Sequence, residues 1–195
     1  DNQIPLFSLE SRTPLKDFDI VGFTLQYEMS YTNILEMLHL GGIPVKAAQR
    51  SQSDPIVVAG GPCAFNPEPL HAFIDAFMIG DGEELIVELN DAIRNARKEG
   101  ASRAEILRRL AKLEGVYVPS LYNDAYNEDG TLRSLTPVDD TVPAVINKRI
   151  QVNMDDAYCP THPPVPYTQV VFDRIMLEIM RGCTRGCRFC QAGML

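Results

Sequence analysis

Three cysteines stand close together near the carboxyl end of the sequence, in the stretch RGCTRGCRFC. Cys183, Cys187 and Cys190 follow the spacing CxxxCxxC. Thiolates bind zinc and iron–sulfur clusters, and two cysteines separated by two residues also form redox-active disulfides. An iron–sulfur cluster usually takes four thiolates, so three cysteines in one loop leave one iron without a protein ligand. Such an iron can bind and activate a further molecule.

Two other interpretations of these cysteines stay open. A structural zinc site needs a fourth ligand, and Cys159 or His162 could supply it from the preceding segment. A redox disulfide between Cys187 and Cys190 would leave the third cysteine of the group without a role. Under the zinc interpretation the segment is a binding module without catalytic activity.

The composition limits which partners and which cellular compartment we expect for this protein. Acidic residues outnumber basic ones by 26 to 18 and the formal net charge is −8, whereas nucleic-acid surfaces need many Lys and Arg side chains. A nucleic-acid partner is therefore not indicated. No apolar run reaches the ~18 residues of a membrane span and no secretory leader is recognisable. We expect a cytoplasmic protein with no membrane association; the oligomeric state is not indicated.

The number and the positions of the cysteines agree with the expected cytoplasmic location. Five cysteines, mostly at one end of the chain, differ from a disulfide framework and favour metal or redox chemistry in a reducing compartment. Cys63 and Cys159 stand outside the CxxxCxxC spacing, and single cysteines are typically small buried residues. We therefore expect structural roles for both.

The elements that position the cysteines begin with alternating strands and helices. Short apolar runs predict strands at 20–25, within PIVVAGG at 55–61, and at 76–79. Apolar residues at helical spacing predict helices within SYTNILEMLHL, at 67–73, at 83–98, and from the cap Ser102 to Leu113. This order is typical of an α/β fold with a small doubly wound parallel sheet.

Parallel α/β sheets bind ligands at the carboxyl ends of their strands. We expect this edge to carry Gln26, Gly60, Gly61 and Gly80. The GDGEE turn at 80–84 is interpreted as a helix start, with Asp81 as the cap and two glutamates near the positive end of the helix dipole.

A different pattern follows Gly115. The turn NEDG within GVYVPSLYNDAYNEDGTLRSL predicts a β-hairpin, and AVINKRIQV is expected to add a strand to it. CPTHPPVPYT has the composition of an exposed linker. DRIMLEIMRGC then predicts a strand over 174–180 that places the cysteines on the loop after it.

The stretch CTRGCRFC resembles the cluster-binding loop of radical S-adenosylmethionine (radical SAM) enzymes, CxxxCxΦC, and Phe189 fills its aromatic position. The resemblance implies a 4Fe-4S cluster on Cys183, Cys187 and Cys190, with S-adenosylmethionine on the open iron. It implies reductive cleavage to methionine and a 5′-deoxyadenosyl radical, with Phe189 near the adenine. It also implies an electron donor of the flavodoxin or ferredoxin type. No residue is assigned a catalytic role, and the substrate is not indicated.

Longer stretches resemble a largely uncharacterised family of radical SAM proteins with an N-terminal cobalamin-binding-like domain. They are IPLFSLES, FDIVGFTLQYEMSYTNIL, GGPCAFNPEP, FIDAFMIGDGEE and LEIMRGCTRGCRFCQAGM. The resemblance implies three segments: an N-terminally incomplete cobalamin-binding-like α/β domain at 1–125, a hairpin and proline-rich linker at 126–168, and the truncated start of a partial (βα)6 barrel at 169–195.

Cobalamin is a further candidate ligand of the first segment. Thr24, in FTLQ, occupies the place of the serine in the SxL element of cobalamin domains, and Gly60 and Gly61 occupy the place of their GG pair. The bare backbone of a glycine pair lets a large ring approach closely, although the same pair also suits a turn that ends a strand. The sequence contains no DxHxxG motif, whose histidine replaces the lower axial ligand of cobalamin.

These features predict a radical SAM enzyme in the intact protein. The 195-residue chain alone is expected to be inactive, because a radical must be held in a closed site that excludes water. Related two-domain radical enzymes suggest an alternative activity, methyl or methylthio transfer to RNA or protein. A non-catalytic iron–sulfur or zinc module is the other alternative.

Overall fold

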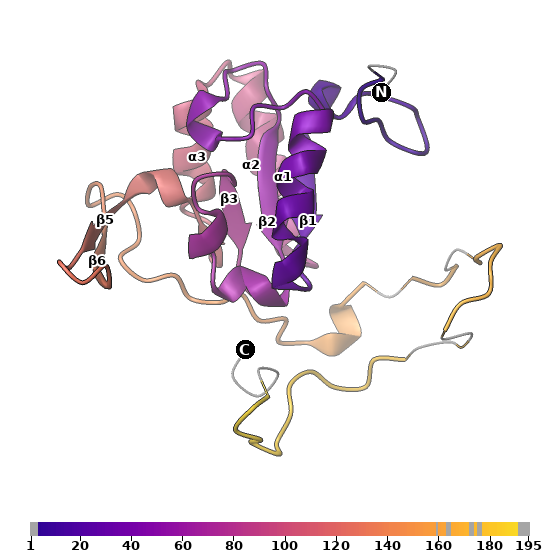
Figure 1. Ribbon diagram of the computed structural model, residues 1–195. Helices are drawn as coiled ribbons and strands as arrows, with labels where there is room; N and C mark the ends of the chain where they lie inside the picture. Colours follow the sequence, from indigo (N-terminus) through magenta and orange to yellow (C-terminus); the bar gives the residue numbers. More distant parts are fainter. Residues whose placement is uncertain (1–3, 159, 163–164, 172–173, 175–176, 191–195) are drawn as a thin grey trace. The chain divides into compact units, whose positions relative to one another are not determined.

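The computed structural model describes residues 4–158, 160–162, 165–171, 174 and 177–190 (Figure 1). The chain divides into two compact units, Asp1–Gln151 and Val152–Leu195. The regular helices and strands of the described residues belong to the first unit.

Four strands form one sheet in the described part of the first unit. They are β1 (Ile20–Thr24), β2 (Ile56–Gly60), β3 (Ala76–Met78) and β4 (Val116–Tyr117), and they follow one another across the sheet in this order. The pairs β1–β2 and β2–β3 are parallel, and β4 is antiparallel to β3. The prediction of an α/β fold with a mostly parallel sheet is confirmed.

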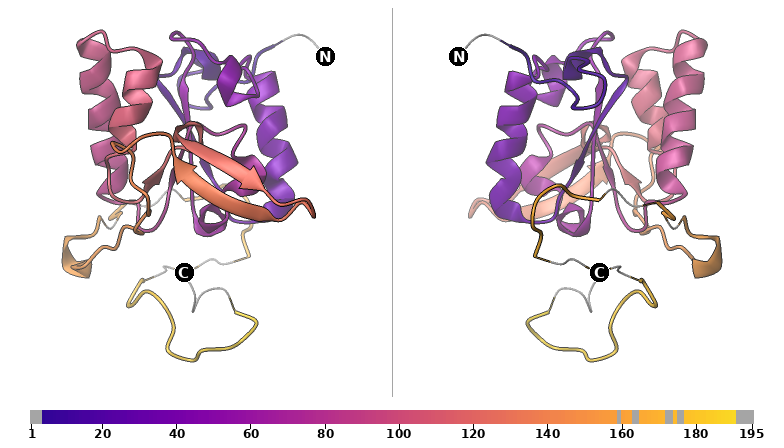
Figure 2. Two further views of the ribbon diagram at one scale, coloured as in Figure 1. Left: turned by 90° about the vertical axis from the view of Figure 1, so that its left-hand side faces the viewer. Right: turned by 90° about the vertical axis from the view of Figure 1, so that its right-hand side faces the viewer.

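Helices cover both faces of this sheet. Figure 2 shows α1 (Tyr31–Leu40) on one face and α2 (Leu85–Lys98) with α3 (Arg103–Leu110) on the other. Successive residues of β2 pack alternately into the two cores, Val57 against the α1 side and Val58 against the α2 and α3 side. The strand is consequently buried along almost its whole length.

The strand order does not reverse among the described strands, which differs from the expected doubly wound pattern. The β1–β2 connection through α1 and the β2–β3 connection both contribute to the core on the same face of the sheet. Right-handed crossovers on one face advance in one direction, so the strands follow one another in chain order. The helices on the second face of the sheet, α2 and α3, follow β3 in the chain. The next strand, β4, is antiparallel to β3.

The start of α3 is as predicted, because a capping residue next to the helix in the sequence determines it. Ser102 caps α3 as expected, because its Oγ accepts a hydrogen bond from the backbone N–H of Glu105 at 3.2 Å. α3 ends at Leu110 rather than Leu113. The helix predicted at 67–73 is wrong, since the structure has only a 3₁₀ turn, Glu68–Leu70. The prolines before and within this turn lack the N–H groups that helical hydrogen bonds need.

The hairpin after Gly115 is confirmed as β5 (Tyr122–Tyr126) and β6 (Leu132–Pro137), which pair antiparallel across the NEDG turn. The strand predicted for AVINKRIQV is wrong. Arg149 instead forms an isolated parallel bridge with Gly80, after the end of β3. Because its backbone groups are engaged there, this segment does not extend the hairpin.

The second unit contains a 3₁₀ turn, Met154–Asp156, among its described residues. Residues 174 and 177–180 of the predicted strand have no strand conformation, and 175–176 lie outside the described residues. A strand needs a hydrogen-bonded neighbour, and these described residues pair with none. Among the helices that the structure describes, none has the length and apolar character needed to cross a membrane.

Candidate functional site

The cysteine loop lies in the second unit. Cys183 and Cys187 are exposed, Cys190 is partly exposed, and all three are free thiols. Within the loop, the N–H of Cys190 donates to the carbonyl of Cys187 at 3.1 Å. Gly182 and Gly186 have φ values of 80° and 61°, a left-handed conformation that favours glycine and reverses the chain direction. The three sulfurs are thus held by neither a core nor a disulfide.

The described residues do not gather into a metal-binding group. No cluster of three or more His, Cys, Asp or Glu side chains with suitable proximity occurs among them. His162, a candidate fourth zinc ligand, is exposed, and its Nδ1 lies 2.9 Å from the Thr161 hydroxyl. Cys159, the other candidate, lies outside the described residues. The side chain of Phe189, which stands within the cysteine loop between Cys187 and Cys190, is exposed, with 93% of its surface accessible.

Cys63 has a different environment. It is 5% exposed and packs in the core on the α1 face, which agrees with the expected structural role. Burial, followed by the nearby carboxylate of Glu28, raises the pKa of the Cys63 thiol above its ordinary 9.0. Burial also raises the pKa of Tyr31 and of Tyr117. All three groups therefore stay neutral in the folded protein at pH values where the unfolded chain begins to ionise.

We predict that the free energy of unfolding falls as pH rises above about 9. The Cys63 contribution is complete below its unfolded pKa and is lost as pH rises through the raised folded value. Urea unfolding between pH 7 and pH 10 measures this slope, and Cys63→Ala is expected to make it shallower between pH 8 and pH 10. Equal slopes for the two proteins would contradict the prediction.

The carboxyl ends of β1 and β2 form a small pocket of about 320 Å³. It brings together the sequence-predicted residues Thr24, Gly60 and Gly61, while Gln26 and Gly80 are not among its lining residues. Sequence reasoning missed two other glycines of the lining, Gly22 and Gly82. A glycine inside a strand pattern, as at Gly22, often marks a close approach to the backbone, and that signal could have found it.

Gly61 has a structural explanation in the turn after β2. Its φ is 94°, and a Cβ there would lie 3.1 Å from the backbone N and O of Leu25. Leu25 donates its N–H to Gly60 at 2.7 Å and accepts from the N–H of Cys63 at 3.0 Å. Gly61 thus lets the chain after β1 join the turn after β2. Gly60 has no positive φ, and its Cβ position meets only ordinary contacts.

A second feature of this edge is the docking of residues 149–151 after β3. The N–H of Arg149 donates to the carbonyl of Ile79 and its carbonyl accepts from the N–H of Asp81, both at 2.9 Å. A Cβ on Gly80 would overlap the carbonyl oxygen of Arg149. Gly115 approaches from the other side, where a Cβ would lie 2.8 Å from the carbonyl oxygen of Ile79. Two glycines therefore permit this close packing of backbone.

The Arg149 side chain reinforces the docked segment. Its guanidinium donates to Glu84 at 2.8 Å and to Glu88 at 2.7 Å, and Glu114 lies 3.8 Å away. Glu84 and Glu88 raise the pKa of Arg149, chiefly through the hydrogen bonds that they accept from its guanidinium. Glu84 and Glu88, near the start of α2, therefore bind the Arg149 side chain in addition to interacting with the helix dipole.

Asp81 does not cap α2, which corrects the sequence interpretation. The N-cap residue is Glu84, and no side chain caps it. Oδ2 of Asp81 instead accepts the backbone N–H of Gln151 at 2.7 Å. The GDGEE turn thus holds the end of the first unit, and the partner that decides this lies far along the chain.

We predict that Gly80→Ala destabilises the first unit and releases the docked segment. The added methyl group would collide with Arg149 backbone atoms at a φ of 105°, and such strain costs roughly 1–3 kcal/mol. Hydrogen exchange at the amide of Arg149 should accelerate. The matched control is Gly82→Ala, because a Cβ at Gly82 meets nothing within 4 Å. Unchanged exchange at Arg149 in Gly80→Ala would refute the prediction.

The sequence of the chain matches a family model and a curated protein. Residues 1–119 match the family model described as radical SAM proteins, N-terminal. The chain is 28% identical over 193 residues to the uncharacterized protein MJ0966 of Methanocaldococcus jannaschii, a match that covers 98% of this chain and 34% of that protein. The chain thus spans about a third of the length of that curated relative. No solved structure gives a significant match.

Proposed function

The chain belongs to the radical SAM proteins that carry this N-terminal domain, and from this premise we propose that the intact protein is a radical SAM enzyme. In this proposal Cys183, Cys187 and Cys190 hold a 4Fe-4S cluster, and S-adenosylmethionine binds at the open iron. The observation that carries the proposal is the set of three free thiols at the spacing CxxxCxxC in a chain of this family.

The chemistry of the donor set fits an iron–sulfur cluster. Thiolates are the usual protein ligands of such clusters, and the three sulfurs take part in no disulfide. The loop between the two glycines of positive φ has open space around both, since a Cβ at either meets nothing within 4 Å.

When bound, the cluster would supply the electron that splits S-adenosylmethionine into methionine and a 5′-deoxyadenosyl radical. The electron would come from a donor of the flavodoxin or ferredoxin type. Phe189, which directly precedes Cys190 and is exposed, would lie near the adenine. Binding there would remove apolar surface from water, which favours contact with a flat base.

We do not extend the proposal to cobalamin. Among the described residues that line the pocket with Thr24, Gly60 and Gly61, none is a histidine, and the sequence has no DxHxxG motif. The turn after β2 already accounts for the conformation of Gly61. The described lining residues supply no imidazole that could replace the lower axial ligand of cobalamin.

Anaerobic reconstitution of the intact protein with iron and sulfide tests the proposal. We expect about four irons and four sulfides per protein, since the cluster is of the 4Fe-4S type. The electron paramagnetic resonance signal of the reduced protein should change when S-adenosylmethionine is added, and 5′-deoxyadenosine should form. A signal that S-adenosylmethionine does not alter would overturn the proposal. Zinc in place of iron after anaerobic purification would favour a non-catalytic binding module.

A further inference from the structure

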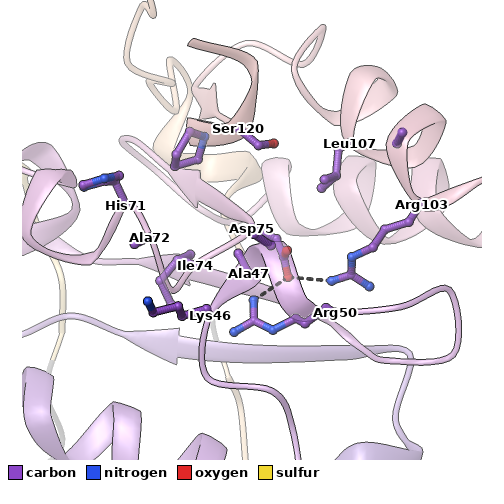
Figure 3. Close-up of a pocket in the computed structure, with 13 residues that line it drawn as sticks. Lys46, Ala47, Arg50, His71, Ala72, Ile74, Asp75, Arg103, Leu107 and Ser120 are labelled. Atoms are coloured by element: carbon purple, nitrogen blue, oxygen red, sulfur yellow. Dashed lines mark hydrogen bonds and ion pairs between the residues drawn. The ribbon is translucent and has the colours of Figure 1, made fainter. Parts of the chain in front are cut away.

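A separate pocket lies at the opposite edge of the sheet, where β2 and β3 begin. Its volume is about 550 Å³, within the roughly 300–1,000 Å³ typical of small-molecule sites. Asp75 directly precedes β3 and lines the pocket, together with residues of the first turns of α3 and of the segment between β4 and β5 (Figure 3). All its lining residues belong to the first unit.

The floor of the pocket is a buried network around the Asp75 carboxylate. Figure 3 shows Asp75 between the guanidinium groups of Arg50 and Arg103, and each donates to Oδ2 at 2.8 Å. The backbone N–H of Val57 donates to the same oxygen at 2.8 Å. Arg50 also donates to the carbonyls of Pro44, Val45 and Phe73. The network fixes both guanidinium groups in position.

The lining of this pocket carries an excess of positive charge. Lys46, Arg50 and Arg103 are cationic and Asp75 is the one acid in the described lining, which leaves three positive charges against one negative. Asp54 and Glu68 are not among the described lining residues; Asp54 accepts hydrogen bonds from Ser51, and Glu68 accepts one from the Tyr117 hydroxyl. In a protein with a net charge of −8, this pocket is a local site of positive potential, and such a site attracts anions.

The walls are small and apolar, which leaves the space that a ligand needs. They are formed by Ala47, Ala48, Ala72, Ala104, Ile74, Leu107 and Pro119. The polar groups that a ligand can reach directly are Lys46, His71 and Ser120, whose side chains are exposed. The Arg50 side chain has no accessible surface, so it acts on a ligand through its charge alone.

We propose that this pocket binds a small organic anion, a carboxylate or phosphate attached to an apolar body. The anionic group lies near Lys46, and the apolar body packs against the alanines and Leu107. The positive potential of the pocket floor favours a negatively charged ligand, and the apolar walls favour a ligand with an apolar body. This site is independent of the cysteine loop, so its test does not depend on a bound cluster.

Phenyl phosphate is a suitable probe, and isothermal titration of the chain measures its affinity. Benzyl alcohol has a similar body without the charge, and inorganic phosphate has the charge without the body. We expect phenyl phosphate to bind at least tenfold more tightly than either. Equal binding of benzyl alcohol would overturn the role of charge, and equal binding of inorganic phosphate would overturn the role of the apolar walls.

Two variants test the location of the site. Lys46→Glu reverses a lining charge and Ala104→Leu fills the cavity; both residues are exposed, so the fold should tolerate the changes. Each is expected to weaken phenyl phosphate binding at least tenfold. Lys98→Glu is the matched control, because it makes the same charge change outside this lining. Circular dichroism confirms folding of each variant. Equal affinities of Lys46→Glu and Lys98→Glu would refute the assignment.

Discussion

Replacement of Cys183, Cys187 or Cys190 with Ala is expected to abolish both iron binding and S-adenosylmethionine cleavage in the intact protein. Each thiolate would hold one iron of the proposed cluster, and a loop with two cysteines leaves two irons without protein ligands. Iron content should fall from about four per protein to near zero. Formation of 5′-deoxyadenosine with dithionite as reductant should fall to the background of the assay.

Cys63→Ala and Cys159→Ala are the matched controls, because both remove one thiol without changing the CxxxCxxC spacing. Cys63 is buried in the core of the first unit, so its replacement affects stability rather than iron content. If a single replacement in the CxxxCxxC group leaves iron and cleavage at the level of these controls, that cysteine is not a ligand. If Cys159→Ala also loses its metal, the four-ligand zinc interpretation gains support.

Asp75→Asn is expected to lower the free energy of unfolding by roughly 3–5 kcal/mol, the cost of removing one partner of a buried ion pair. The substitution keeps the size of the side chain, so no cavity contributes. It leaves the guanidinium groups of Arg50 and Arg103 without a compensating charge, at side-chain exposures of 0% and 12%. Burial already lowers the pKa of Arg50, against the opposing effect of Asp75. Urea denaturation followed by circular dichroism measures the loss.

Asp91→Asn provides the control for a surface pair. Asp91 accepts from Arg94 at 2.6 Å, and both side chains are about half exposed. Solvent screens such pairs, and their loss costs about 0–1 kcal/mol. If Asp75→Asn costs no more than Asp91→Asn, the network is not an important source of stability. If Asp75→Asn does not fold, Arg103→Gln removes one cation instead and is expected to cost less than Asp75→Asn.

Local patterns of the sequence determined the class of the fold. Apolar runs of strand length and apolar residues at helical spacing are properties of neighbouring residues, so they predicted β1, β2 and β3 and the helices α1, α2 and α3. The cap at Ser102 and the hairpin turn NEDG are equally local, and both occur in the structure. The cysteine spacing was also visible in the sequence alone. At 67–73 the helix prediction failed. It relied on the spacing of apolar residues, whereas the prolines in this segment lack the N–H groups that helical hydrogen bonds need.

Only the tertiary structure decided the roles of residues whose partners lie far along the chain. Asp81 looked like a helix cap, yet it binds the backbone of Gln151. Gly80 looked like part of a turn, yet it makes room for Arg149. Asp75 precedes a strand in the sequence, and its pairing with Arg50 and Arg103 arises only when three separate segments, one of them the start of α3, meet at one edge of the sheet. The physical reason is that a hydrogen bond or ion pair forms between groups that folding brings together, whereas a sequence pattern records only near neighbours.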